Sequence, residues 1–181
     1  MKPAGYLINT RDGLAGEPGL FYDYVLAGNG LFVRGRSSLL EATVNIAPAE
    51  VRGLSPLEER VRLPKGKIPG NLYELTLSIL LADRYRERYL AVTWEGEYRL
   101  RQPWQEGSSS GVCYQTLPNT VLDIHSHGPL EAFFSSTDNT DEQGLRLYMV
   151  IGRLDTLTPE VLMRVGAYGY FAPVEIDQIF G

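Results

Sequence analysis

The sequence predicts an α/β fold, a sheet with helices packed on it. Three features lead to this class: many strand-like apolar runs, one long amphipathic helix pattern, and a short acidic helix late in the chain. The chain has 181 residues, enough for one domain with a sizeable core. Its 44% hydrophobic and 22% charged residues are the ordinary balance of a soluble globular protein.

A β-hairpin is predicted over residues 21–35. Two apolar-rich runs, Tyr22–Ala27 and residues 31–34, flank the tripeptide Gly28-Asn29-Gly30. Asn-Gly between two such runs is typical of a tight hairpin turn.

The composition changes at residues 54–70, which are rich in proline, glycine and charge and are typical of a linker. A β-prone segment over residues 39–51, with Pro48 near its end, precedes them. We therefore expect residues 1–66 to form a β-rich N-terminal extension or subdomain, and residues 67–181 to form the main domain.

The clearest helix begins next, with Pro69 at a plausible first position. Its apolar residues step by four and three, which places them on one helical face. These residues are Ile68, Leu72, Leu75, Ile79 and Ala82. The helix is expected to fray over residues 84–87.

The rest of the chain is mainly strand-like. Residues 102–111 form a polar loop, and residues 128–144 form a loop that opens a short acidic helix. The predicted strands are Tyr89–Trp94, Tyr98–Arg101, residues 112–116, residues 120–127, Leu145–Gly152, and a strand or hairpin over residues 161–173 broken by Gly166 and Gly169.

Charge and cysteine content exclude several classes of protein. The net charge is −5 and no run of Lys or Arg is present, so we expect no nucleic-acid partner. The single cysteine, Cys113, allows no intrachain disulfide and no Cys-x-x-Cys site, which suits a reducing compartment. No signal-peptide pattern and no apolar run of about 18–20 residues is present. We expect a cytoplasmic chain with no membrane partner.

The chain has only two histidines, His125 and His127. Side chains two apart in a strand point to the same face, so both imidazoles are predicted to project to one side, with Leu122 and Ile124 on the other. Two imidazoles held in this way favour a zinc site.

A catalytic zinc site typically has three protein ligands and an open position for water. Asp138, eleven residues after His127, is the best third ligand. The small polar residues before it, Ser135 to Thr137, are able to cap a helix that carries Asp138 and ends near Gln143. The expected ligand set is thus His125, His127 and Asp138.

The spacing from His125 to Asp138 reads His-x-His, seven residues, Ser135, two residues, Asp138. It resembles the JAMM motif of the MPN (Mov34/MPN/PAD-1) metalloproteases. The stretch from His125 to Gly144 also resembles the bacterial plasmid-cassette branch called PRTRC system protein A. The resemblance implies an MPN, cytidine-deaminase-like mixed sheet flanked by helices over residues 67–181. Gly128 stands where many members have proline, a departure that bears on loop rigidity and not on ligation.

The family implies an upstream glutamate where a long helix meets the next strand, and Glu87 occupies that junction. It would act as general base, passing a proton from a zinc-activated water to the leaving amine. The alternative for Glu87 is an exposed helix-end carboxylate paired with Arg84 or Arg88. The other glutamates considered for this role are Glu74, Glu95, Glu97 and Glu131.

Two residues close to the motif have further interpretations. Ser135 would hydrogen-bond the tetrahedral oxyanion or orient the water. Asp123 shares the histidine face, either as a hydrogen-bond partner of an imidazole or, the preferred interpretation, as a strand-end residue.

Three other features carry weaker hypotheses. Residues 107–111 match the Gly-x-Ser-x-Gly pattern, but they lack the preceding strand and following helix of a nucleophile elbow, so a mobile loop beside the substrate is preferred. Cys113 is interpreted as a small buried residue and not as a catalytic thiol. Tyr168 and Tyr170 either line a groove or, as preferred, belong to a strand core or edge.

The resemblance implies a zinc-dependent isopeptidase or peptidase, similar to deubiquitinases, that cleaves at the C-terminal tail of a ubiquitin-like or sulfur-carrier protein. The PRTRC resemblance implies activating-enzyme-like and conjugating-enzyme-like partners from the same cassette. The alternative function is a non-catalytic MPN scaffold whose zinc is structural or absent. Iron or manganese are able to replace zinc in such a ligand set.

Overall fold

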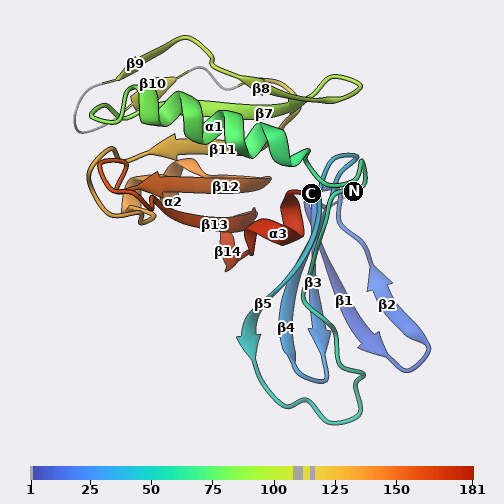
Figure 1. Cartoon of the computed structure of the whole chain (residues 1–181). Helices are drawn as coiled ribbons and strands as arrows, with labels where there is room; N and C mark the ends of the chain where they lie inside the picture. Colours follow the sequence, from blue (N-terminus) through green and yellow to red (C-terminus); the bar gives the residue numbers. More distant parts are fainter. Residues whose placement is uncertain (1, 108–111, 115–116) are drawn as a thin grey trace. The chain divides into compact units, whose positions relative to one another are not determined.

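The computed structural model describes residues 2–107, 112–114 and 117–181 (Figure 1). The chain divides into two compact units. Unit 1 comprises residues 1–64, 142–145 and 165–172, and unit 2 comprises residues 65–141, 146–164 and 173–181. None of the helices among the described residues combines the length and the apolar character needed to span a bilayer.

The first sheet is mixed and has the strand order β2-β1-β3-β4-β5-β6. Its strands are β1 (Ala4–Thr10), β2 (Gly13–Glu17), β3 (Tyr22–Ala27), β4 (Gly30–Arg36), β5 (Glu41–Pro48) and β6 (Arg60–Arg62). Strands β1 and β3 are parallel, and the other neighbours are antiparallel. A small core of Leu7, Val25, Ala27 and Phe32 forms here, because these apolar residues alternate with partly exposed ones along their strands.

The predicted hairpin is confirmed, since Ala27 pairs with Gly30 across the turn Gly28-Asn29. Gly30 has a φ of 145°, and a Cβ there would lie 2.5 Å from the carbonyl oxygen of Ala47. Only glycine tolerates this backbone and this close approach.

The segment 54–70, predicted as a linker, is more ordered than its composition indicates. It contains β6, which pairs with β5, and the backbone N–H of Leu57 donates to Oδ1 of Asn29 at 2.8 Å. A short edge strand needs no apolar alternation, so the sequence pattern does not reveal it. Strands β1 and β2 were likewise not predicted individually.

The second sheet is also mixed, with the order β14-β13-β12-β11-β7-β8. Its strands are β7 (Tyr89–Trp94), β8 (Tyr98–Arg101), β11 (Thr120–Ser126), β12 (Leu145–Gly152), β13 (Glu160–Ala167) and β14 (Tyr170–Pro173). A separate pair is formed by β9 (Gln105–Gly107) and β10 (Val112–Tyr114). Strand β11 runs antiparallel to β7 and parallel to β12, so it is central and buried.

The structure confirms the strands predicted in this region, except that residues 115–116 of the predicted strand 112–116 lie outside the described residues, and it changes two details. Gly166 lies inside β13 and does not break it, whereas Gly169 follows Tyr168 in the turn before β14. The predicted polar loop of residues 102–111 contains β9, and its residues 108–111 lie outside the described residues.

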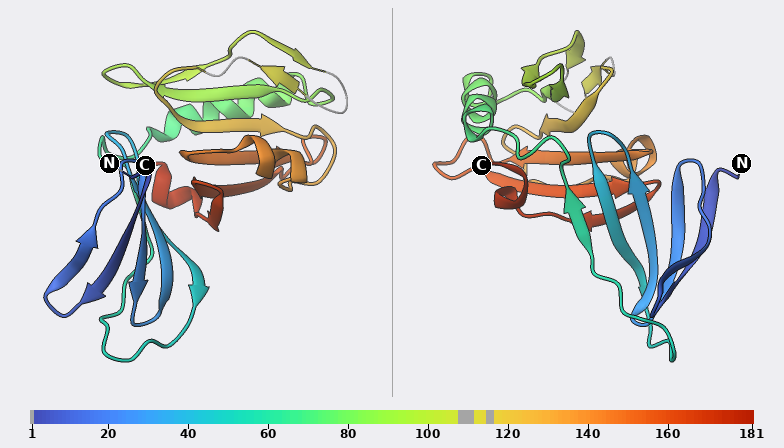
Figure 2. Two further views of the ribbon diagram at one scale, coloured as in Figure 1. Left: turned by 180° about the vertical axis from the view of Figure 1, so that it is seen from behind. Right: turned by 90° about the vertical axis from the view of Figure 1, so that its right-hand side faces the viewer.

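Helix α1 (Gly70–Ala82) lies along the strands of the second sheet, in front of them in Figure 1 and behind them in the left view of Figure 2. The helix is confirmed, but its predicted face is wrong. Leu80 and Thr76 are buried, whereas Leu75 is 47% exposed. Leucine and isoleucine occupy almost every side of α1, so their spacing does not fix one face. Thr76 is accommodated because its hydroxyl donates to the carbonyl of Leu72 at 2.8 Å.

Two short helices complete the elements found among the described residues. Helix α2 (Ser136–Asp141) is the predicted acidic helix, and α3 (Ile176–Ile179) near the C-terminus was not predicted. Together with the two mixed sheets, these few helices agree with the α/β fold class predicted from the sequence.

Candidate metal centre

Strand β11 and the residue that follows it place both histidines on one face, as predicted from the period of two. Leu122 and Ile124 are fully buried on the opposite side. The ring centroids of His125 and His127 lie 5.1 Å apart. His127 follows the last residue of β11, so the two imidazoles stand at the end of a central strand.

Asp138 reaches this strand end from α2. The backbone N–H of Ser135 donates to Oδ2 of Asp138 at 2.6 Å, and the N–H of Asp138 donates to Oγ of Ser135 at 3.1 Å. This is the reciprocal arrangement of a capping box, and it confirms that Ser135 caps the helix. The cap holds one carboxylate oxygen of Asp138 and leaves the other free to face the histidines.

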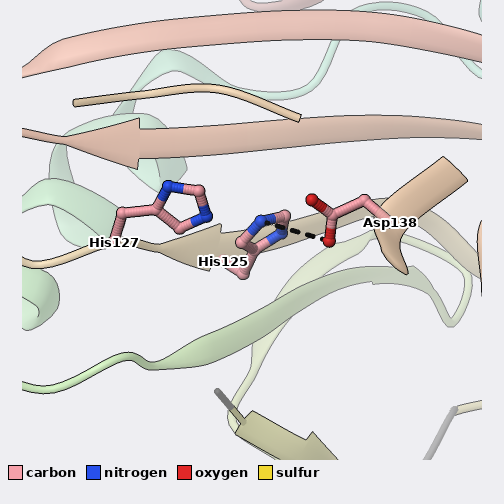
Figure 3. Close-up of side chains that lie close together, drawn as sticks. All are labelled: His125, His127 and Asp138. Atoms are coloured by element: carbon pink, nitrogen blue, oxygen red, sulfur yellow. Dashed lines mark ion pairs between the residues drawn. The ribbon is translucent and has the colours of Figure 1, made fainter. Parts of the chain in front are cut away.

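The three side chains converge, as Figure 3 shows. One ligand atom from each of His125, His127 and Asp138 lies within 4.8 Å of the other two. Ligands placed about 2.0–2.1 Å from a tetrahedral zinc ion stand roughly 3.3 Å apart. Small side-chain rotations would therefore bring this set onto one ion.

The hydrogen bonding of His127 leaves its second ring nitrogen ready for a metal. Its Nδ1 lies 3.1 Å from the carbonyl oxygen of Glu131. A carbonyl only accepts, so the neutral ring carries its proton on Nδ1 and presents the lone pair of Nε2. Metal-bound histidines commonly show this arrangement.

His125 provides the clearest test of whether a cation fits. Its Nε2 is buried and has no hydrogen-bond partner among the described residues, although Oδ1 of Asp138 stands 3.7 Å away. Burial lowers the pKa of His125 to about 4, against the opposing effect of Asp138. The ring is thus neutral at pH 7, and the pair is not a salt bridge. A buried ring nitrogen that lacks a hydrogen bond and lies beside a carboxylate is satisfied by a cation bound between the two groups.

Glu87 lies in the loop between α1 and β7, within electrostatic reach of this cluster. Burial, and secondarily the carboxylate of Asp138, raises the pKa of Glu87, while His127 opposes the rise. The alternative of a surface ion pair is not supported: Arg88 pairs with Asp83, and the guanidinium of Arg84 lies 5.2 Å from the Tyr85 ring centroid.

The other glutamates considered as the base are engaged or remote. Glu95 pairs with Arg101, Glu97 pairs with Arg99, and the carboxylate of Glu131 pairs with Arg153. Glu74 is exposed on α1. Among the glutamates considered, only Glu87 has a pKa shifted by His127 and Asp138.

Ser126, the residue between the two histidines, is a functional candidate that the sequence did not reveal. It is fully buried, and its Oγ accepts a hydrogen bond from the backbone N–H of Arg88 at 3.1 Å. Its own N–H donates to the carbonyl of Arg88 at 2.9 Å. Ser126 therefore ties the loop of Glu87 to the strand of the histidines. The only indication in the sequence is a small hydroxyl residue at the central position of His-x-His.

Asp123 has neither expected role. It is buried within β11, where Nη1 of Arg146 donates to its Oδ2 at 2.6 Å and the hydroxyl of Tyr89 donates to its Oδ1. It is thus not a strand-end residue, and none of the imidazole contacts found in the described residues involves it. Asp123 anchors a buried polar cluster on the histidine side of the sheet.

The remaining hypotheses are resolved in part. Tyr168 stacks on Tyr22 at a centroid distance of 4.6 Å, and the hydroxyls of Tyr170 and Tyr24 lie 3.1 Å apart. Tyr170 lies in the edge strand β14, as preferred, whereas Tyr168 lies in the turn before it and not in a strand. The serines of the Gly-x-Ser-x-Gly pattern and the side chain of Cys113 lie outside the described residues.

Comparison with known proteins adds one match. A family model described as prokaryotic homologs of the JAB domain matches residues 86–165. No curated protein matches the chain. The matched segment contains the loop of Glu87, strand β11 and helix α2. The match thus supports the JAB/MPN family for the part of the chain that carries Glu87, His125, His127, Ser135 and Asp138.

Proposed function

We propose that the chain is a zinc-dependent peptidase or isopeptidase of the JAMM type. The observation that carries this proposal is the convergence of His125, His127 and Asp138 within 4.8 Å, with the buried Nε2 of His125 unpartnered among the described residues. The JAB match over the same segment supports it. Three protein ligands leave a fourth position on a tetrahedral zinc ion for a non-protein ligand such as water, as in catalytic sites.

The residues around this centre would divide the chemistry between them. A zinc ion bound there would act as a Lewis acid and lower the pKa of a coordinated water from about 15.7 towards about 7. Glu87 would accept a proton from the attacking water and return it to the amine nitrogen as the carbon–nitrogen bond breaks. Its raised pKa favours holding that proton between the two steps.

Ser135 would stabilise the developing negative charge. Its Oγ accepts a hydrogen bond from the N–H of Asp138, so the hydroxyl proton remains available for donation to a substrate oxygen. Losing one such donor typically costs about 10²–10³ in rate.

The substrate we propose is the C-terminal tail of a ubiquitin-like or sulfur-carrier protein, with activating-enzyme-like and conjugating-enzyme-like partners in the cytoplasm. This part rests on the resemblance to the JAMM and PRTRC families. An extended tail pairs with a sheet edge, and β8 is an edge of the second sheet, separated from the histidine strand β11 by β7 alone.

The first test is metal content. Because three protein ligands hold one catalytic zinc ion, we expect about one zinc per chain in the unaltered protein and almost none in His125→Ala. Chelation should remove the ion and leave the far-ultraviolet circular dichroism spectrum unchanged, whereas a structural zinc site would unfold with metal loss. A chain that takes up no zinc after reconstitution would be a scaffold and not an enzyme.

The second test separates binding from turnover. Glu87→Gln should retain zinc and lose cleavage of a ubiquitin-like protein carrying a fluorogenic amide at its C-terminus. Glu74→Gln, an exposed glutamate on α1, is the matched control and should cleave normally. Full activity of Glu87→Gln would remove Glu87 from the mechanism.

A further inference from the structure

The helix that carries Asp138 is short and exposes much of its surface to solvent. Helix α2 has six residues and none of them is buried. Helices this short are marginal on their own and depend on tertiary contacts. The Ser135 cap shapes the first turn, but a cap is local and does not fix the helix against the sheet. Another contact is needed to place the Asp138 carboxylate beside the histidines.

Arg164 on β13 supplies contacts on both sides of the metal-binding aspartate. It is 8% exposed. Its Nη1 donates to Oδ1 of Asn139 at 2.7 Å, and its guanidinium carbon stands 3.8 Å from the ring centroid of Phe134. Phe134 precedes the capping serine and Asn139 follows Asp138, so one side chain bridges the segment that holds both.

We infer that Arg164 is a positioning residue for the metal centre: it clamps residues 134–139 to β13 and thereby sets the affinity of the His125–His127–Asp138 site for zinc. This inference rests on the proposed metal site but not on peptidase activity. A planar guanidinium is suited to the task, because it stacks on an aromatic face while one edge donates a directed hydrogen bond.

The charge of Arg164 acts in the opposite direction. A fixed cation near the site repels a divalent ion, so its removal would by itself strengthen zinc binding. For a substitution that removes Arg164, loss of the clamp predicts weaker zinc binding, whereas loss of the charge predicts tighter zinc binding. Asn139→Ala separates them, since it deletes one contact of the clamp and leaves the charge in place.

The experiment measures the zinc dissociation constant of the full chain by competition with a chromophoric chelator. Asn139→Ala and Arg164→Met should each weaken binding by about tenfold or more, the usual effect of losing a partner behind a metal ligand. Arg164→Lys keeps the charge without the planar fork and should also bind more weakly. Thr137→Ala, an exposed neighbour on α2, is the control and should bind as the unaltered chain does.

A spectroscopic measurement reports the ligand geometry directly. The visible absorption of the cobalt-substituted protein should change in Asn139→Ala and remain unchanged in Thr137→Ala. Circular dichroism of the metal-free variants verifies that they fold. Because Asn139 is exposed, Asn139→Ala is expected to fold even if Arg164→Met does not, and it then tests the clamp alone. Unchanged affinity in Asn139→Ala, or tighter binding in Arg164→Met, overturns the clamp. An unaltered chain that binds no zinc overturns the metal site itself.

Discussion

Ser135 and Asp138 are joined by two reciprocal hydrogen bonds, one from each backbone N–H to the other side chain, at 2.6 and 3.1 Å. The same carboxylate presents its second oxygen to His125, 3.7 Å from Nε2. The start of α2 and the metal-binding group are therefore one structural unit, and a change in the cap should alter the metal site.

Ser135→Ala should weaken both the helix and the site. Loss of a capping side chain costs about 1 kcal/mol, and zinc affinity should fall because Asp138 is held less firmly. Thermal unfolding of the metal-free chain and a zinc titration measure the two effects. Ser136→Ala changes an exposed neighbouring serine and should alter neither. Normal zinc affinity in Ser135→Ala would show that the helix cap does not contribute to zinc binding.

Ser126→Ala should lower turnover more than it lowers zinc content. The substitution leaves the N–H of Arg88 without its side-chain acceptor, and a buried unsatisfied donor costs about 1–3 kcal/mol. The loop of Glu87 should then move relative to the histidines. The kcat of the fluorogenic amide and metal content per chain distinguish the effects. Ser78→Ala, which changes an exposed serine of α1, is the control. An unaltered kcat in Ser126→Ala would contradict the link to Glu87.

The Asp123–Arg146 pair should stabilise the fold without contributing to metal binding. Asp123 is 5% exposed and accepts hydrogen bonds from Arg146 and Tyr89. Removing one partner of a buried pair costs about 3 kcal/mol or more, so Arg146→Met should unfold at lower urea concentration with zinc content unchanged. The double variant Asp123→Asn/Arg146→Met should recover part of that loss, and strict additivity would argue against coupling.

Gly128→Pro should damage the turn after the histidines, although many proteins with the JAMM motif that this segment resembles have proline there. Gly128 has a φ of 57°, and a Cβ would lie 3.1 Å from the carbonyl oxygen of Arg84. Proline is fixed near −65°, so the loop cannot follow the same path. Gly128→Asn should be milder, because asparagine enters the left-handed region more readily. Comparing unfolding midpoints checks the order, and equal midpoints for both variants would refute it.

The stability of the metal-free chain should depend on pH through His125. Burial lowers its pKa to about 4 in the folded chain, compared with 6.5 when unperturbed. The folded state binds the proton less tightly, so this contribution to stability is complete above about pH 6.5 and is lost as the pH falls towards about 4. The full effect is about 3 kcal/mol.

Urea unfolding in the presence of a chelator, at pH 7 and at pH 4.5, measures this loss of stability. His125→Asn removes the titrating ring and should lose less stability between the two pH values than the unaltered chain. Equal losses in both proteins would show that His125 is not buried as a neutral group.

Much of the fold follows from local pattern. Alternation and turn residues predict β3, β4, β7, β8, β11 and β12, because these strands have apolar runs bounded by turns. Helix α1 was predicted, but its buried face was not, since apolar residues surround it. Strands β2 and β6 and helix α3 are short or exposed, and a pattern of a few residues is not distinctive.

The sequence by itself determined the shared face of His125 and His127, the cap at Ser135 and the spacing that singles out Asp138, since strand period and helix capping depend on neighbours along the chain. Only the tertiary structure decided what surrounds them. Ser126 bonds the Glu87 loop, Asp123 pairs with Arg146, and Arg164 reaches Asn139 across 25 positions. Such contacts join segments that no local periodicity relates, because they depend on the way β7, β11, β13 and α2 pack together.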